Sequence, residues 1–134
     1  MPKNILLAYD GSESADRAFD QALDLAGKYG AQLHVLTVAR PPEFGEEVET
    51  EAVVENSRRH AHQIQKPLKE KAPGAHLEVV VGHPAVKITA YAESHGIDLV
   101  VMGHRGKTLF ERWLIGSVAK KVISYAPCSV LVVR

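Results

Sequence analysis

The chain has 134 residues, the usual length of one domain, and 46% of them are hydrophobic, which excludes a disordered or fibrous protein. Sixteen Lys and Arg residues balance sixteen Asp and Glu residues, so no overall charge attracts nucleic acid or an anionic membrane, and any anion site must be local. The only cysteine, Cys128, excludes an intramolecular disulfide and a cysteine-based metal cage.

The N-terminal residues lead directly into a short apolar run that begins at Ile5. This run is too short for the hydrophobic region of a signal peptide or for a membrane span. Together with the single cysteine, it predicts a cytoplasmic protein without membrane insertion.

Five short runs of apolar and β-favouring residues predict buried strands, because each run is bounded by turn or helix signals. In chain order they are Ile5 to Tyr9, Gln32 to Val38, His76 to Val81, Asp98 to Met102 and Ser129 to Val133. Their nearly continuous apolar character is typical of strands that are covered on both faces.

Apolar residues at helical spacing predict a helix between each strand and the next. The first stripe starts at Ala15, and the second lies between Glu43 and Lys71, where Pro67 should kink the helix near its end. A third helix begins at Pro84 and stops near Gly96. The last stripe starts at Ile115.

This alternation predicts a single α/β domain over residues 1–134, with a parallel sheet covered by helices on both faces. In such sheets, ligands bind beyond the carboxyl ends of the strands, where the strand order reverses. The turn that starts at Asp10 and the glycine-rich segment that starts at Gly103 both follow predicted strands.

That segment is the most distinctive part of the sequence. Gly103, His104, Arg105 and Gly106 are followed, after nine residues, by Gly116 and Ser117 at the start of the last predicted helix. Glycines let backbone N–H groups approach a ligand, and a helix N-terminus presents free donors, so the pattern is typical of a phosphate site.

A G-x-x-G pattern, nine residues and then G-S resembles the ATP-binding signature of the universal stress protein family. The opening strand with its acidic turn, the fourth strand and the closing strand from Ala126 also resemble that family. The resemblance implies a five-stranded sheet in the order 3-2-1-4-5, of the adenine nucleotide alpha hydrolase-like type. It also implies an ATP site at the strand ends and a homodimer that senses or relays stress and energy state.

Carried over residue by residue, the resemblance implies that five residues hold the phosphates and ribose: Gly103, Arg105, Gly106, Gly116 and Ser117. Asp10 matches the acidic residue that approaches the nucleotide and its Mg²⁺, and Val38 offers backbone contacts to adenine. The metal is expected to arrive with the ATP, since no other ligand cluster is evident.

Several side chains near this pattern have two interpretations. His104 is either a variable loop residue or a phosphate contact, and Phe110, Trp113 and Leu114 either pack their loop onto the domain or form a lid or partner contact. Lys107 follows Gly106 as in a Walker A loop, but the first glycine of that motif is missing.

The sequence leaves three functions open: a regulatory ATP-binding protein with an unknown regulated partner, a slow ATP or adenylate hydrolase, and a nucleotide-free dimeric scaffold. No base or second carboxylate is recognisable near the phosphates, so no catalytic residue is assigned. We expect the homodimer to form through the strand from Ser129 to Val133, which should lie at a sheet edge and lacks Lys and Pro.

Overall fold

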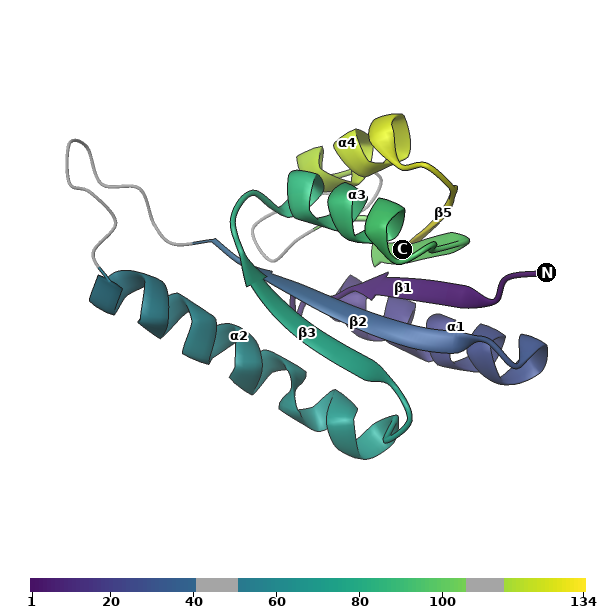
Figure 1. The fold of residues 1–134 in the computed structure, drawn as a ribbon, viewed down its shortest axis with the longest axis horizontal. Coiled ribbons are helices and arrows are strands. Elements are labelled where there is room, and N and C mark those ends of the chain that lie inside the picture. Colours follow the sequence, from purple (N-terminus) through teal and green to yellow (C-terminus); the bar gives the residue numbers. More distant parts are fainter. Residues whose placement is uncertain (41–50, 106–114) are drawn as a thin grey trace.

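A computed structural model describes residues 1–40, 51–105 and 115–134. Five strands form one parallel sheet (Figure 1): β1 (Asn4–Ala8), β2 (Gln32–Ala39), β3 (His76–Val81), β4 (Leu99–Gly103) and β5 (Ser129–Val133). Their order across the sheet is β3-β2-β1-β4-β5, and every neighbouring pair is parallel. The predicted fold class and all five predicted strands are confirmed, with bounds that differ by at most one residue.

Four helices connect the strands: α1 (Glu13–Tyr29), α2 (Glu51–Lys71), α3 (Pro84–Ser94) and α4 (Ser117–Tyr125). Figure 1 shows α1 and α2 on one face of the sheet and α3 and α4 on the other. In the described ranges, no helix combines the length and hydropathy that crossing a bilayer requires.

Helix α1 has clear sequence signals at both ends. The Ser12 Oγ accepts a hydrogen bond from the Ala15 backbone N–H at 3.2 Å, which caps the N-terminus. Gly30 ends the helix in the left-handed conformation, with φ of 62°, which costs glycine little because it has no Cβ. Between these ends, Ala18 and Phe19 are buried against the sheet.

Helix α2 runs through Pro67 and ends at Lys71, so the proline does not terminate it. The Pro67 nitrogen has no hydrogen and cannot donate to the Gln63 carbonyl, which removes one bond from the last turns. The part of the predicted segment from Glu43 to residue 50 lies outside the described residues.

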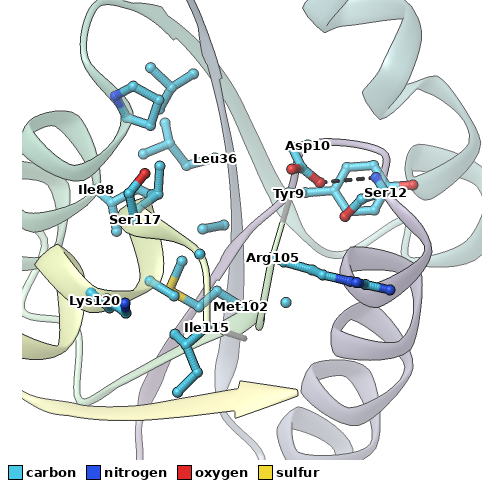
Figure 2. A pocket seen from close by; sticks show the side chains of 17 residues that line it. Tyr9, Asp10, Ser12, Leu36, Ile88, Met102, Arg105, Ile115, Ser117 and Lys120 are labelled. Atoms are coloured by element: carbon cyan, nitrogen blue, oxygen red, sulfur yellow. Dashed lines mark hydrogen bonds between the residues drawn. The ribbon is translucent and has the colours of Figure 1, made fainter. Parts of the chain in front are cut away.

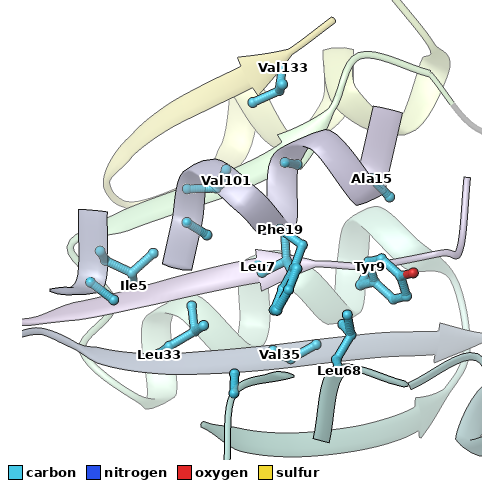
Figure 3. Close-up of a cluster of buried hydrophobic side chains, with 14 residues drawn as sticks. Ile5, Leu7, Tyr9, Ala15, Phe19, Leu33, Val35, Leu68, Val101 and Val133 are labelled. Atoms are coloured by element: carbon cyan, nitrogen blue, oxygen red, sulfur yellow. The ribbon is translucent and has the colours of Figure 1, made fainter. Parts of the chain in front are cut away.

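The hydrophobic core lies in two layers because successive side chains of a strand point to opposite faces. Ile5 and Leu7 of β1 belong to the layer under α1 and α2 (Figure 3), and Leu6 belongs to the layer under α3 and α4. All three are fully buried. Burial on both faces explains why the strands are continuously apolar in sequence.

The register brings the carboxyl ends of the central strands together. Ala8, the last residue of β1, is the partner of Leu36 in β2 and of Met102 in β4. Since β1 is followed across the sheet by β2 on one side and β4 on the other, the crossover direction reverses between β1 and β4. This reversal places the turn after β1 and the segment after β4 beside one another.

Candidate functional site

A cavity of about 400 Å³ lies at this reversal point, over the carboxyl ends of β1, β2 and β4. Figure 2 shows Asp10 and Ser12 on its α1 side, and Ile88 and Ser117 on its α3 and α4 side. The volume lies in the range of small-molecule and cofactor sites, and the position is the one at which open α/β sheets bind ligands.

One part of the cavity wall is apolar. Its side chains come from β2, α3, β4 and the residue before Gly116: Leu36, Val38, Pro84, Ile88, Met102 and Ile115. Val38 is half-buried within β2, which continues to Ala39. This surface suits the flat face of a base or another apolar ring.

The turn after β1 supplies the acidic group of the site. The Asp10 carboxylate is exposed, and its Oδ1 accepts a hydrogen bond of 2.9 Å from the Ser12 backbone N–H. This bond closes a turn in which Gly11 has a φ of 79°. The turn therefore holds one carboxylate at the mouth of the cavity.

Tyr9 also lines the cavity, but its hydroxyl is not suited to act as an acid or base catalyst. It donates a hydrogen bond to Asp16 Oδ1 in the first turn of α1. Burial, followed by the hydrogen bond and negative charge of Asp16, raises the pKa of Tyr9 well above its ordinary value of 10.0. The phenol therefore stays protonated at physiological pH.

The N-terminus of α4 supplies backbone donors. Gly116 is the N-cap residue, and its N–H donates to the His104 carbonyl at 2.7 Å. The first helical bond runs from the Lys120 N–H to the Gly116 carbonyl, so the N–H groups of Ser117, Val118 and Ala119 precede the hydrogen-bonded part of the helix. All three residues line the cavity, which favours an anion there.

Gly103 has a packing reason to be glycine. A Cβ on Gly103 would overlap Ser14 Oγ and lie 2.9 Å from the Ala15 backbone nitrogen, so the start of α1 packs directly against the end of β4. The predicted role in nucleotide binding remains compatible, since Gly103 also lines the cavity.

Arg105 follows, and Figure 2 shows its side chain extending toward α1. Its Nη1 is buried and has no hydrogen-bond partner in the described part of the structure. Arg105 is also among the lining residues, and a buried cationic donor without a partner can bind an anionic group.

His104 is neither an exposed loop residue nor a residue that lines the cavity. Its side chain is 3% exposed and does not line the cavity. Its backbone N–H donates to the Val133 carbonyl at 2.7 Å, and its Nδ1 lies 3.3 Å from the same oxygen. His104 therefore joins the end of β5 to the N-cap of α4.

The structure brings six of the seven predicted binding residues to one cavity: Asp10, Val38, Gly103, Arg105, Gly116 and Ser117. Gly106 lies outside the described residues, as do Lys107, Phe110, Trp113 and Leu114.

Several lining residues were not assigned from the sequence, and Ile88 and Lys120 are two of them. Both could have been found by helical spacing, because Ile88 is four residues after Pro84 and Lys120 is three residues after Ser117.

Metal ligands are few at the site. No group of three His, Cys, Asp or Glu side chains within residues 1–40, 51–105 and 115–134 is placed to hold a metal ion. Among the cavity residues that the structure describes, Asp10 is the only carboxylate. One carboxylate fits Mg²⁺ that is bound mainly by phosphate and water, and does not fit a structural metal.

The fold and this cavity define an open α/β protein with a cavity at the sheet's reversal point. The sequence profile of the Universal stress protein family matches residues 1–134. The chain therefore belongs to the universal stress protein family, as its sequence predicted.

Individual relatives agree with this membership. Universal stress protein MJ0531 of Methanocaldococcus jannaschii is 34% identical over 98% of this chain and 82% of its own length. The solved structure of universal stress protein UspA from Lactobacillus plantarum is 29% identical, covers 98% of this chain and 97% of its own, and has a TM-score of 0.87. A universal stress protein solved in complex with cAMP is 25% identical over 99% of this chain and 97% of its own, with a TM-score of 0.66.

Proposed function

We propose that this chain is a regulatory stress-response protein that binds ATP and, as a homodimer, relays nucleotide state to a partner protein. The observation that carries the proposal is the convergence of six predicted binding residues, from separate segments of the chain, on one cavity. A similar universal stress protein has been solved with cAMP, which supports an adenine nucleotide as the class of ligand.

In this proposal, the two parts of the cavity bind different parts of the nucleotide. The adenine lies against the apolar wall and contacts the backbone of Val38. The phosphates lie at the N-terminus of α4, where backbone N–H groups, the Ser117 hydroxyl and the Arg105 guanidinium donate hydrogen bonds. Asp10 faces the ribose or an Mg²⁺ ion that enters with the phosphates.

Slow hydrolysis of ATP or an adenylate is the second candidate, and the chemistry of the described lining residues disfavours a fast reaction. A general base for water needs a group that is deprotonated at physiological pH and lies near the phosphates. Tyr9 stays protonated and bonded to Asp16, and Asp10 has no second carboxylate beside it among the described lining residues. We therefore assign no catalytic residue.

The proposed homodimer forms through β5. Within the described sheet, β5 pairs only with β4, so its other edge is free. The strand is Ser129 followed by four apolar residues, without a charge or proline to block pairing. Such an edge is a template for a second copy of the same strand.

A cytoplasmic location stays a prediction from the single cysteine and the N-terminal sequence.

The ligand can be identified in the purified protein. After denaturation, mass spectrometry of the released small molecules should find ATP, whereas ADP or AMP after incubation with ATP would favour the hydrolase. Calorimetric titration with ATP, ADP, AMP and cAMP then ranks the affinities. If a nucleotide-free preparation binds none of the four, the scaffold alternative replaces the proposal.

A further inference from the structure

A second hollow lies between α2 and the beginning of β3, and it shares no lining residue with the cavity described above. It has a volume of about 550 Å³, and Ala75 and Leu77 form part of its apolar surface. One wall carries a row of basic side chains on α2: Arg59, His62, Lys66 and Lys69. We call this hollow the α2–β3 groove.

The basic row follows from helix geometry. Intervals of three, four and three residues place the four side chains on one flank of α2. The opposite side of the helix is buried through Ala61 and Leu68. The row is therefore a fixed feature of how α2 packs.

A buried amide holds α2 at this distance from the sheet. Gln65 Nε2 donates to Glu78 O at 2.8 Å and to Thr37 Oγ1 at 3.0 Å, so one side chain ties the helix to both β2 and β3. Gln65 is 4% exposed, and losing these bonds would leave a buried polar group without partners. The groove is therefore built into the packing of α2.

The groove is locally positive in a chain whose formal net charge is zero. No Asp or Glu is among its described lining residues. Within the described ranges, Lys66 and Lys69 are exposed and form no ion pair, and the ion pair on this helix joins Arg58 to Glu55 outside the lining. Two lysines that no carboxylate neutralises attract an anionic partner.

The groove reaches the start of the outermost described strand, where Leu77 lines it. In the described sheet, β3 is the outermost strand and pairs only with β2. Its sequence, His76–Val81, contains four apolar residues and no Lys or Pro, and its one carboxylate, Glu78, follows Leu77 and so points to the opposite face of the sheet from the groove. Figure 1 shows α2 running beside this strand, and residues of α2 line the groove together with Leu77 of β3.

We propose that the α2–β3 groove binds an acidic, extended peptide segment of another protein, which adds to the sheet beside β3. Backbone hydrogen bonds to β3 would give affinity, and Glu or Asp side chains facing Lys66 and Lys69 would give specificity. The contact with the regulated partner of the proposed function would then lie apart from both the proposed nucleotide site and the edge of β5.

Two other occupants fit less well. In a symmetric contact between two copies, the same patch meets itself, so each basic row would approach the other without carboxylates to neutralise it. A single-stranded nucleic acid would need stacking surfaces, and no Phe, Tyr or Trp is among the described lining residues. A strand edge, by contrast, offers hydrogen bonds that a peptide backbone matches.

The test uses fluorescence anisotropy with the full chain and a labelled peptide that alternates Glu and Val. We expect binding that weakens at least about tenfold in the double variant Lys66→Glu, Lys69→Glu, because two attractions become repulsions. The matched control, Lys71→Glu with Lys121→Glu, makes the same charge change at exposed positions outside the groove and should alter affinity less than about threefold. A peptide that alternates Lys and Val should show the reverse preference between wild type and the groove variant.

Strand addition is tested by the same acidic peptide with N-methylated backbone amides, which keeps the charge but cannot donate to β3. We expect this peptide to lose binding, and amide shifts in NMR spectra to concentrate on β3 and α2. The proposal is wrong if the acidic peptide does not bind at millimolar concentration, or if the groove variant binds it like wild type. It is also wrong if the methylated peptide binds equally well, or if single-stranded DNA competes more strongly than the peptide.

Discussion

The Ser14 hydroxyl donates a hydrogen bond of 2.9 Å to the carbonyl oxygen of Arg105, which lies 91 residues further along the chain. Ser14 is 4% exposed and packs directly against Gly103. The N-terminus of α1 therefore holds the backbone at both Gly103 and Arg105. These contacts set the start of the segment in which the proposed phosphate ligands lie.

Ser14→Ala should weaken ATP binding several-fold. The variant loses one buried hydrogen bond, worth about 1 kcal/mol of unfolding free energy, and releases the Arg105 carbonyl. Ser124→Ala is a matched control, because its exposed hydroxyl donates to the Lys120 carbonyl within α4 at 3.0 Å. Calorimetric titration and urea unfolding measure both effects. Equal ATP affinities in the two variants would contradict a positioning role for Ser14.

Gly103→Ala should destabilise the fold by about 1 to 3 kcal/mol, because the new methyl group would overlap the start of α1. Gly27→Ala should instead stabilise the fold by about 0.5 to 1 kcal/mol. Gly27 lies within α1, and, apart from its chain neighbours and the nearby helix backbone, no heavy atom lies within 4 Å of its added Cβ. Urea unfolding compares the two variants. A neutral Gly103→Ala would mean that α1 can move away from β4 without cost.

Backbone access should matter more for ATP binding than any one side chain. Micromolar affinity requires about 8 kcal/mol, whereas a helix terminus contributes about 0.3 to 2 kcal/mol, so several donors must converge. Ser117→Ala removes one hydroxyl and should weaken binding several-fold. Gly116→Val and Gly106→Val place branched side chains where phosphate approaches and should weaken it far more.

The backbone of Gly116 does not forbid a side chain, because its φ of −65° is ordinary for any residue. A loss of affinity in Gly116→Val would therefore report the space that phosphate needs. Circular dichroism checks that the variants remain folded, and calorimetry measures ATP binding. If both glycine variants fold and bind ATP with wild-type affinity, the phosphates do not bind at this segment.

Val132→Lys should weaken the proposed homodimer by placing a charge in β5, whose outer edge is free in the described sheet. Light scattering across micromolar concentrations measures the oligomer, and circular dichroism checks the fold of the variant. The wild type provides a test that does not depend on any substitution. A wild type that is monomeric at these concentrations would exclude association through β5.

A histidine in the core should make stability depend on pH. His34 of β2 is buried, with Nδ1 at 2.8 Å from the Tyr91 hydroxyl and Nε2 at 3.2 Å from Asn4 Oδ1. A neutral imidazole satisfies both partners, since one nitrogen accepts from the hydroxyl and the other donates to the amide oxygen. A protonated imidazole carries two donors and a charge.

Burial lowers the pKa of His34 below its ordinary value of 6.5, and the nearby His76 and His95 lower it further. The charge of Glu78 opposes this shift. The folded chain therefore binds fewer protons than the unfolded chain as the pH falls below about 6.5. The stability from neutral His34 is present above that pH and is lost as the pH falls toward the lowered pKa.

Urea unfolding at pH 8 and pH 5.5 should thus find a lower free energy of unfolding in acid. His34→Gln should reduce this pH dependence, because glutamine can hydrogen-bond but does not titrate. His60→Gln, at an exposed position on α2, is the control and should keep the wild-type dependence. A wild type equally stable at both pH values would contradict the expected effect of His34.

The local pattern of the sequence was sufficient for the elements and the general place of the site. Continuous apolar strands indicated a sheet buried on both faces, and Pro84 and Gly96 indicated the ends of a helix that the structure contains. The resemblance of the segment from Gly103 to Ser117 to the universal stress protein signature indicated which strand end and which helix start share a cavity. The strand and helix signals are local, because they depend on backbone geometry within a few residues.

Tertiary packing alone decided what several of those residues contact. Gly103 faces Ser14 across 89 positions of sequence, and His104 lies buried against Val133. The α2–β3 groove likewise depends on Gln65 reaching β2 and β3. Propensity and periodicity describe one element at a time. The side chains that meet between two elements are therefore set by the depth and register of their packing.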